Sequence, residues 1–108
     1  MARYLFQAAY TSEAWAAQVQ NPQNRIDVIR PVIERLGGRI ECAYFAFGDY
    51  DVIGIMEMPD NVSAAAFSLA GSAGGGIKAV KTTPLLTIDE GIEAMRKAAG
   101  AGYRPPGR

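Results

Sequence analysis

The feature that most constrains this chain is a pair of apolar segments, residues 39–47 and 50–58, separated only by Gly48 and Asp49. In an extended conformation, successive side chains of each segment point to opposite faces, and both segments are rich in residues that favour β-strands. Because the connection is so short, the two strands must run antiparallel as a hairpin. Pro59-Asp60-Asn61 then stops the second strand and caps a helix. The sequence therefore predicts a β-hairpin that leads directly into a helix.

The chain before this hairpin predicts one strand and two helical pieces. Residues 3–10 alternate like a strand, and Ser12 is the expected N-cap of a helix that ends near Gln20. Asn21-Pro22 suits an N-cap followed by a proline in the first turn, so a second helical piece should start there and end at Gly37-Gly38.

The chain after the hairpin predicts a helix of small residues over 62–70, a glycine-rich loop over 71–76, a strand over 77–85 and a helix over 88–99. The complete order, βαββαβ with a terminal helix, indicates an α+β, ferredoxin-like fold with a four-stranded antiparallel sheet and its two main helices on one face. Residues 1–99 are expected to form a single domain, and residues 100–108 a flexible tail or arm.

Two of the predicted helices carry an apolar stripe at spacings of three and four residues. The stripes are Ile26, Ile29, Ile33 and Leu36 in the second helical piece, and Ile88, Ile92, Met95 and Ala99 in the last helix. Thr87 and Glu90 form a capping box in front of the last helix.

Composition excludes several classes of function. The chain has 108 residues with 11 basic and 11 acidic side chains, so no excess positive charge attracts nucleic acid or an anionic membrane. It has no histidine, which removes Ser–His and Cys–His nucleophile pairs and histidine ligation of haem or zinc. Cys42 stands alone among apolar neighbours and is expected to be an inert thiol. No metal and no cofactor are therefore expected.

The start of the chain predicts the compartment. It enters a strand pattern at once, without the basic and apolar regions of a signal peptide, and no apolar run approaches the roughly 20 residues that span a bilayer. We expect a cytoplasmic protein.

Both faces of the first three strands are largely apolar, which is unusual for an antiparallel sheet with one face in water. Two helices can cover only one face. A second copy, packed sheet to sheet in a dimeric α/β barrel, is the simplest cover for the other. The alternative is that the C-terminal helix folds back over that face.

The run from Phe47 to Ile55, with Met58-Pro59-Asp60, resembles the signature of the GYD-domain family, small bacterial proteins named after this Gly-x-Tyr-Asp-like turn. Leu36-Gly37-Gly38 and Lys78 to Thr82 resemble the family as well, so the likeness covers nearly the whole chain. The resemblance implies a ferredoxin-like member of the dimeric α/β-barrel superfamily. That superfamily includes haem-degrading and quinone-forming monooxygenases, isomerases and amino-acid-sensing regulatory domains.

The turn of the hairpin holds the candidate catalytic residues. Asp49 and Asp51 flank Tyr50, and two carboxylates beside a phenol at one end of a sheet are capable of acid–base chemistry. If the protein is an enzyme, Asp51 or Asp49 would transfer the proton. The structural alternative is that Asp49 serves the turn, Asp51 accepts backbone N–H groups and Tyr50 packs.

Aromatic residues and a lysine are the candidate ligand-binding residues. Tyr10, Trp15 and Tyr44, together with Tyr50, could line a pocket for a flat organic molecule, with an aromatic core or dimer interface as the alternative. Lys81 could meet an anionic ligand, or pair with Asp51 or Glu57.

The preferred interpretation is a small homo-oligomer that binds a small organic molecule between the sheet and the first helical region, with cofactor-independent catalysis as an extension. One alternative is a non-catalytic structural or partner-binding module that uses the Gly100–Arg108 arm. Another is a sensing domain that resembles the amino-acid-binding regulators.

Overall fold

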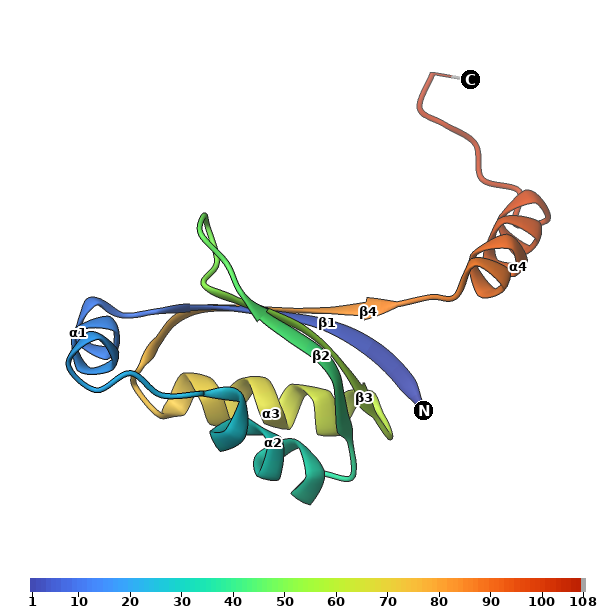
Figure 1. The fold of residues 1–108 in the computed structure, drawn as a ribbon. Helices are drawn as coiled ribbons and strands as arrows, with labels where there is room; N and C mark the ends of the chain where they lie inside the picture. Colours follow the sequence, from blue (N-terminus) through green and yellow to red (C-terminus); the bar gives the residue numbers. More distant parts are fainter. Residues whose placement is uncertain (108) are drawn as a thin grey trace.

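The computed structural model describes residues 1–107, which form one four-stranded sheet with helices on one of its faces (Figure 1). The elements are β1 (Ala2–Tyr10), α1 (Ser12–Gln20), α2 (Ile26–Arg35), β2 (Arg39–Phe45), β3 (Val52–Met58), α3 (Asn61–Ala73), β4 (Ile77–Leu85) and α4 (Ile88–Ala99). Neighbouring strands are antiparallel in the order β2-β3-β1-β4. The predicted α+β, ferredoxin-like fold is confirmed.

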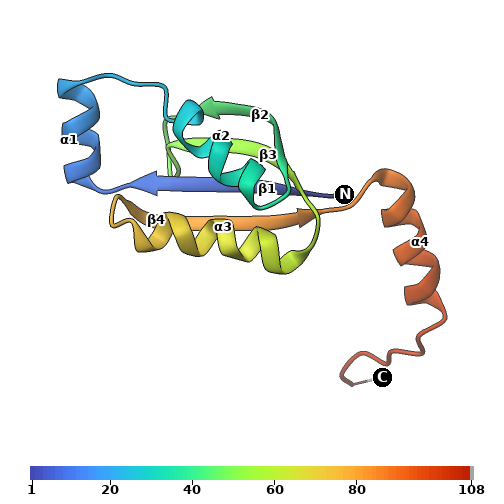
Figure 2. The same ribbon diagram turned by 90° about the horizontal axis from the view of Figure 1, so that it is seen from below.

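The sheet has a helix face and an open face. Figures 1 and 2 show α2 and α3 lying against the helix face, α1 beyond one end of the sheet, and α4 standing away from the body at the other end. Strand register assigns to the open face Leu5, Gln7, Cys42, Tyr44, Ile53, Ile55, Lys81 and Thr83. The two central strands, β1 and β3, therefore carry apolar side chains on both faces, as their sequences predict.

The core lies between the helix face and the two helices that cover it. Tyr4 and Phe6 of β1 pack with Ile33 of α2 and with Met56 and Met58 of β3, and each of these side chains is at most 3% exposed. Gly54 of β3 lies directly beneath the Phe6 ring, where a Cβ atom would overlap the ring. The aromatic residues Tyr4 and Phe6 of β1 therefore belong to the core on this face.

The end of α2 fixes the approach of the chain to β2. Gly37 adopts a left-handed φ of +89° and donates its N–H to the carbonyl of Glu34 at 2.9 Å, while Gly38 donates to Ile33 at 3.0 Å. These two bonds form a Schellman motif, as the glycine pair predicts. A Cβ at Gly38 would overlap Met58 Sδ and the Glu57 carbonyl, so this glycine also allows close packing on β3.

Two predicted helix starts are wrong. Thr11, rather than Ser12, caps α1: its backbone is extended and its Oγ1 accepts the N–H of Ala14 at 3.1 Å. Asn21 ends α1 and does not start α2. Helix α2 begins only at Ile26, whose N–H donates to the Asn24 side chain at 3.0 Å.

The hairpin connection is longer than predicted and covers residues 46–51. The N–H of Ala46 donates to the Asp51 carbonyl at 2.8 Å and closes a loop outside the paired strands. Helix α3 is also longer than predicted and continues through Gly71 to Ala73 before the glycine loop.

The open face is not covered by the C-terminal helix, so that alternative is wrong. Helix α4 has no buried residue and stands clear of the sheet (Figure 1). One end of the open face carries an ionic cluster: Glu57 contacts Arg39 and lies 3.4 Å from Arg3, and Arg3 Nε lies 2.6 Å from Glu41. The middle of that face is apolar, with Leu5, Ile53 and Ile55 half-buried.

Candidate functional site

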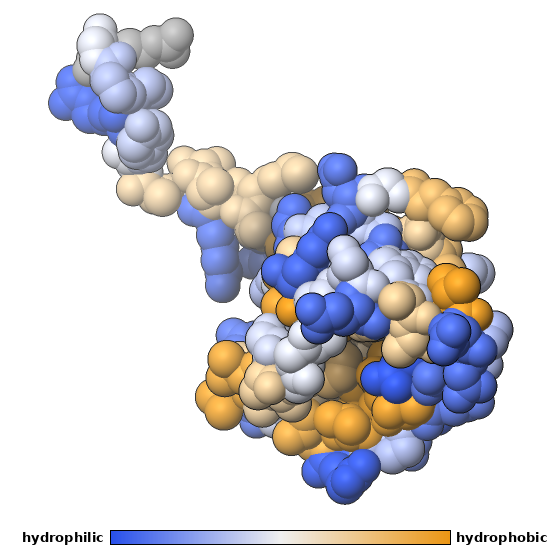
Figure 3. Space-filling model, turned by 90° about the vertical axis from the view of Figure 1, so that its left-hand side faces the viewer, coloured by the Kyte–Doolittle hydropathy of each residue, from blue (hydrophilic) through white to orange (hydrophobic). Residues whose placement is uncertain are grey.

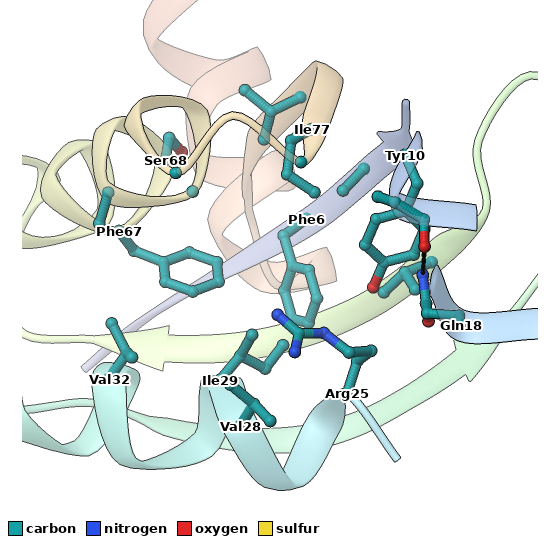
Figure 4. A pocket seen from close by; sticks show the side chains of 18 of the residues that line it. Phe6, Tyr10, Gln18, Arg25, Val28, Ile29, Val32, Phe67, Ser68 and Ile77 are labelled. Atoms are coloured by element: carbon teal, nitrogen blue, oxygen red, sulfur yellow. Dashed lines mark hydrogen bonds between the residues drawn. The ribbon is translucent and has the colours of Figure 1, made fainter. Parts of the chain in front are cut away.

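A cavity of about 410 Å³ lies between α1, α2, α3 and the helix face of the sheet, and we call it the α1–α3 cavity. Figure 4 shows Val28, Ile29 and Val32 of α2 on one side, with Phe67 of α3 and Phe6 of β1 closing the other sides. Figure 3, viewed from the end that carries α1, shows apolar surface gathered on the lower part of the body, where Figure 1 places α2 and α3. The cavity is therefore an apolar space that opens toward solvent.

Polar side chains gather at one end of this cavity, where α1 and the start of α2 meet β1. Tyr10, Gln18 and Arg25 line this end. Burial raises the pKa of the Tyr10 phenol, and the nearby Arg25 guanidinium partly opposes the rise. The phenol is therefore neutral at physiological pH and can donate a hydrogen bond into the cavity.

Arg25 is the one charged side chain among the described residues that line the cavity. It occupies the N-cap position of α2, and Figure 4 shows its guanidinium turned into the cavity in front of Phe6. One of its nitrogens, Nη1, donates to Gln23 Oε1 at 3.3 Å. Within residues 1–107, no carboxylate lies within ion-pair distance of it. The site therefore holds a cation beside apolar walls.

Three of the predicted site residues come together beside this cavity. Asp51 Oδ2 accepts the backbone N–H of Tyr10 at 2.9 Å and the indole N–H of Trp15 at 3.1 Å. The Trp15 and Tyr10 rings pack edge to face with centroids 5.3 Å apart. Tyr10 lines the cavity, whereas Trp15 and Asp51 contact Tyr10 without lining the cavity. These contacts match the structural alternative for Asp51, because its carboxylate joins the 46–51 loop to β1 and α1.

The other predicted site residues lie elsewhere. Asp49 is exposed in the 46–51 loop, where Tyr50 is half-buried. Tyr44 is 71% exposed on the open face. Lys81 is exposed on the open face opposite Gln7. The seven residues therefore do not form one site.

The predicted pairing of Lys81 with Asp51 or Glu57 is wrong. Across the described residues Lys81 makes no ion pair. Glu57 is bound by two arginines, and the Arg39 guanidinium, followed by Arg3, lowers the pKa of its carboxyl.

The comparison with protein families tests the resemblance directly. The family model of the GYD domain matches residues 4–95. This chain belongs to the GYD domain family. The matched part begins within β1 and ends within α4, so it contains β2, β3, β4, α1, α2 and α3 completely. Comparisons with curated proteins and with solved structures found no match. No helix among the described residues of this GYD domain is long and apolar enough to cross a membrane.

Sequence reasoning missed the residues that give the cavity of this GYD domain its polar end, Gln18 and Arg25. One signal was present for Arg25. A basic side chain at a helix N-terminus opposes the helix dipole, so it needs another reason to be there. Gln18 gave no comparable signal, because a glutamine in an amphipathic helix is ordinary.

Proposed function

We propose that this protein is a small cytoplasmic homo-oligomer that binds a small organic molecule in the α1–α3 cavity. The observation that carries the proposal is the combination of apolar walls with polar groups gathered at one end. Binding sites for small molecules have this composition, and their volumes run from about 300 to 1,000 Å³. A cavity of 410 Å³ suits a compact ligand.

Binding rather than catalysis is the function that this geometry favours. Asp51 does not line the cavity, and its Oδ2 already accepts the N–H groups of Tyr10 and Trp15, so no carboxylate is placed to act on a bound ligand among the described lining residues. The Tyr10 phenol is neutral and lies near Arg25, so it can donate a hydrogen bond but is a poor base. Cofactor-independent catalysis remains an extension of the binding proposal.

The open face supports the homo-oligomer part of the proposal. Leu5, Ile53 and Ile55 form its apolar middle, and Tyr44 stands exposed beside them. A second copy packed against this face would bury these side chains and remove apolar area from water. The expected arrangement is a dimeric α/β barrel in which the two cavities face outward.

Native mass spectrometry under gentle conditions, followed by mild denaturation, tests both parts. We expect an oligomer that releases a small molecule of reproducible mass. Val28→Phe, at a 45% exposed position on the cavity wall, should reduce the amount of that molecule. Val19→Phe is the matched control, since Val19 is 75% exposed on α1 and does not line the cavity. Equal ligand content in the two variants would contradict the proposal.

The subunit contact has its own test. Ile55→Glu places a charge in the middle of the open face, and sedimentation velocity should then show a folded monomer. Val19→Glu adds the same charge on an exposed part of α1 and should leave the oligomer intact. An Ile55→Glu protein that stays oligomeric would exclude the sheet-to-sheet arrangement.

A second candidate function is a partner-binding module, and the position of α4 favours it. Ile88 and Met95 are 82% and 71% exposed on a helix that stands off the body. An apolar stripe in that position suits packing against another chain. A chain that ends at Leu86 should keep its sheet but lose the oligomer if α4 makes the contact. Retention of the full oligomer would exclude α4 as the contact between copies.

A further inference from the structure

We propose that the α1–α3 cavity selects a small monocarboxylate with an apolar body, whose carboxylate is bound by Arg25. This inference rests on the proposed binding function and names the chemical class of its ligand. It rests on the charge, the hydrogen-bond donors and the apolar walls of the cavity.

The charge of the cavity requires an anion. Arg25 carries a positive charge at neutral pH, and it faces Phe6 and the valines of α2 without a carboxylate among the described residues to balance it. An apolar molecule that entered the cavity would strip water from the guanidinium and leave the charge uncompensated, which is unfavourable. A ligand that brings its own negative charge avoids this cost.

The donors at this end of the cavity match a carboxylate. A guanidinium presents a planar fork of N–H groups that binds a carboxylate through two parallel hydrogen bonds. The neutral Tyr10 hydroxyl lies beside this fork and can donate a further bond. A single negative charge balances the single cation of the lining. A phosphate dianion would leave excess charge next to the apolar walls, so the carboxylate is favoured.

The rest of the cavity matches an apolar body. Phe6 and Phe67 pack edge to face with centroids 5.8 Å apart, and Val32 lies opposite them. The polar group on that side, the Ser68 hydroxyl, already bonds Thr82 Oγ1 at 2.5 Å. A ligand with its carboxylate at Arg25 therefore extends an apolar chain or ring toward Phe67.

The test compares two probes that differ only in the charged group, sodium octanoate and 1-octanol. Trp15 is the single tryptophan of the chain and packs on Tyr10, so its fluorescence reports binding at this end of the cavity. Amide chemical shifts from nuclear magnetic resonance locate the bound probe. In the wild-type protein we expect octanoate to bind about tenfold more tightly than octanol, or better.

Arg25→Gln removes the charge, and we expect it to weaken octanoate binding by about tenfold to a hundredfold while octanol binding changes little. Arg25→Lys keeps the charge without the fork and should lie between wild type and Arg25→Gln. Arg30→Gln is the matched control, because Arg30 is an exposed arginine of the same helix that does not line this cavity. Circular dichroism checks that each variant is folded.

The outcomes separate this inference from the proposed function. If octanol binds as tightly as octanoate to the wild-type protein, and Val28→Phe weakens both, the cavity binds ligands but the carboxylate inference is overturned. Equal loss of octanoate binding in Arg25→Gln and Arg30→Gln overturns it as well. If neither probe binds to the wild-type protein, both the inference and the cavity proposal for such ligands are overturned. Because the wild-type comparison needs no variant, the test stands even if Arg25→Gln does not fold.

Discussion

Helices α2 and α4 have similar patterns of apolar residues, but the pattern is buried in α2 and exposed in α4. Each carries four apolar residues at helical spacing, as its sequence predicts. In α2 the stripe faces the sheet, and Ile33 is completely buried. In α4 the stripe faces solvent, with Ile88 82% exposed. The difference shows that an apolar stripe predicts a partner surface without saying whether that surface belongs to the same chain.

The largest expected effect is at the buried stripe. Ile33→Ala should lower the free energy of unfolding by about 2–5 kcal/mol, because it leaves a cavity beneath the sheet. Ile88→Ala, the matching change in α4, should cost less than about 0.5 kcal/mol in dilute protein. Urea unfolding followed by circular dichroism measures both. Similar losses in the two variants would mean that α4 is packed in solution, and the contrast would fail.

Two glycines sharpen the same contrast. Gly38→Ala should lower the free energy of unfolding by about 1–3 kcal/mol, since its Cβ would overlap Met58 and the Glu57 carbonyl. Gly91→Ala lies within α4, where a Cβ meets nothing within 4 Å, and should stabilise the helix by about 0.5–1 kcal/mol. Thermal unfolding and helix content by circular dichroism measure the two changes. A neutral Gly38→Ala would contradict the close packing of α2 on β3.

Low pH should affect the stability of the sheet and the stability of α4 independently. The pKa of Glu57 is lowered by Arg39 and Arg3, and that of Glu90 by the Thr87 N–H. Each carboxylate therefore stabilises the folded state above its unfolded pKa, about 4.3, and this contribution is lost as pH falls through the lower folded pKa. Glu57→Gln should reduce the acid dependence of global unfolding in urea. Glu90→Gln should change only amide exchange in α4. An effect on global unfolding would mean that α4 packs against the rest of the protein.

The last pair of changes is at the helix caps, where the effect in α4 should stay local. Thr87→Ala removes the capping box of α4 and should cost about 1 kcal/mol, visible only as faster hydrogen exchange in the first turn of α4. Asp60→Ala is the matched change in α3, where the side chain accepts the Ser63 N–H at 2.7 Å. Because α3 packs on the sheet, loss of this cap should lower the free energy of global unfolding. Equal effects of Thr87→Ala and Asp60→Ala on global unfolding would contradict the difference in packing between α3 and α4.

The sequence predicted those parts of the fold that depend on local chemistry. Alternating side chains located the strands, Gly37-Gly38 ended α2, and Thr87 with Glu90 started α4 as expected. The predicted start of α2 was wrong because Asn21 and Pro22 suit the end of one helix as well as the start of another. In the structure Asn21 ends α1, and the bond from the Ile26 N–H to the Asn24 side chain marks the start of α2.

The candidate site was harder to predict because it depends on gaps between elements. The α1–α3 cavity exists where side chains of α2 and α3 do not fill the space above β1, and no periodicity records such a gap. The hairpin turn held the most distinctive residues, yet Asp51 proved to hold Tyr10 and Trp15 in place. For Arg25 the sequence offered only its place near a helix start, and its position among apolar walls became visible only in the structure.

The two outer strands, β2 and β4, are the edges of the sheet, and both carry features that hinder pairing with a further strand. Strand β4 carries Pro84, which has no N–H to offer a further strand, together with Lys78 and Lys81. Strand β2 is interrupted by an irregularity between Ile40 and Cys42. Proline, lysine and bulges of this kind discourage the edge-to-edge growth of sheets. A chain protected in this way is less prone to grow into open-ended fibres through the edges of its sheet.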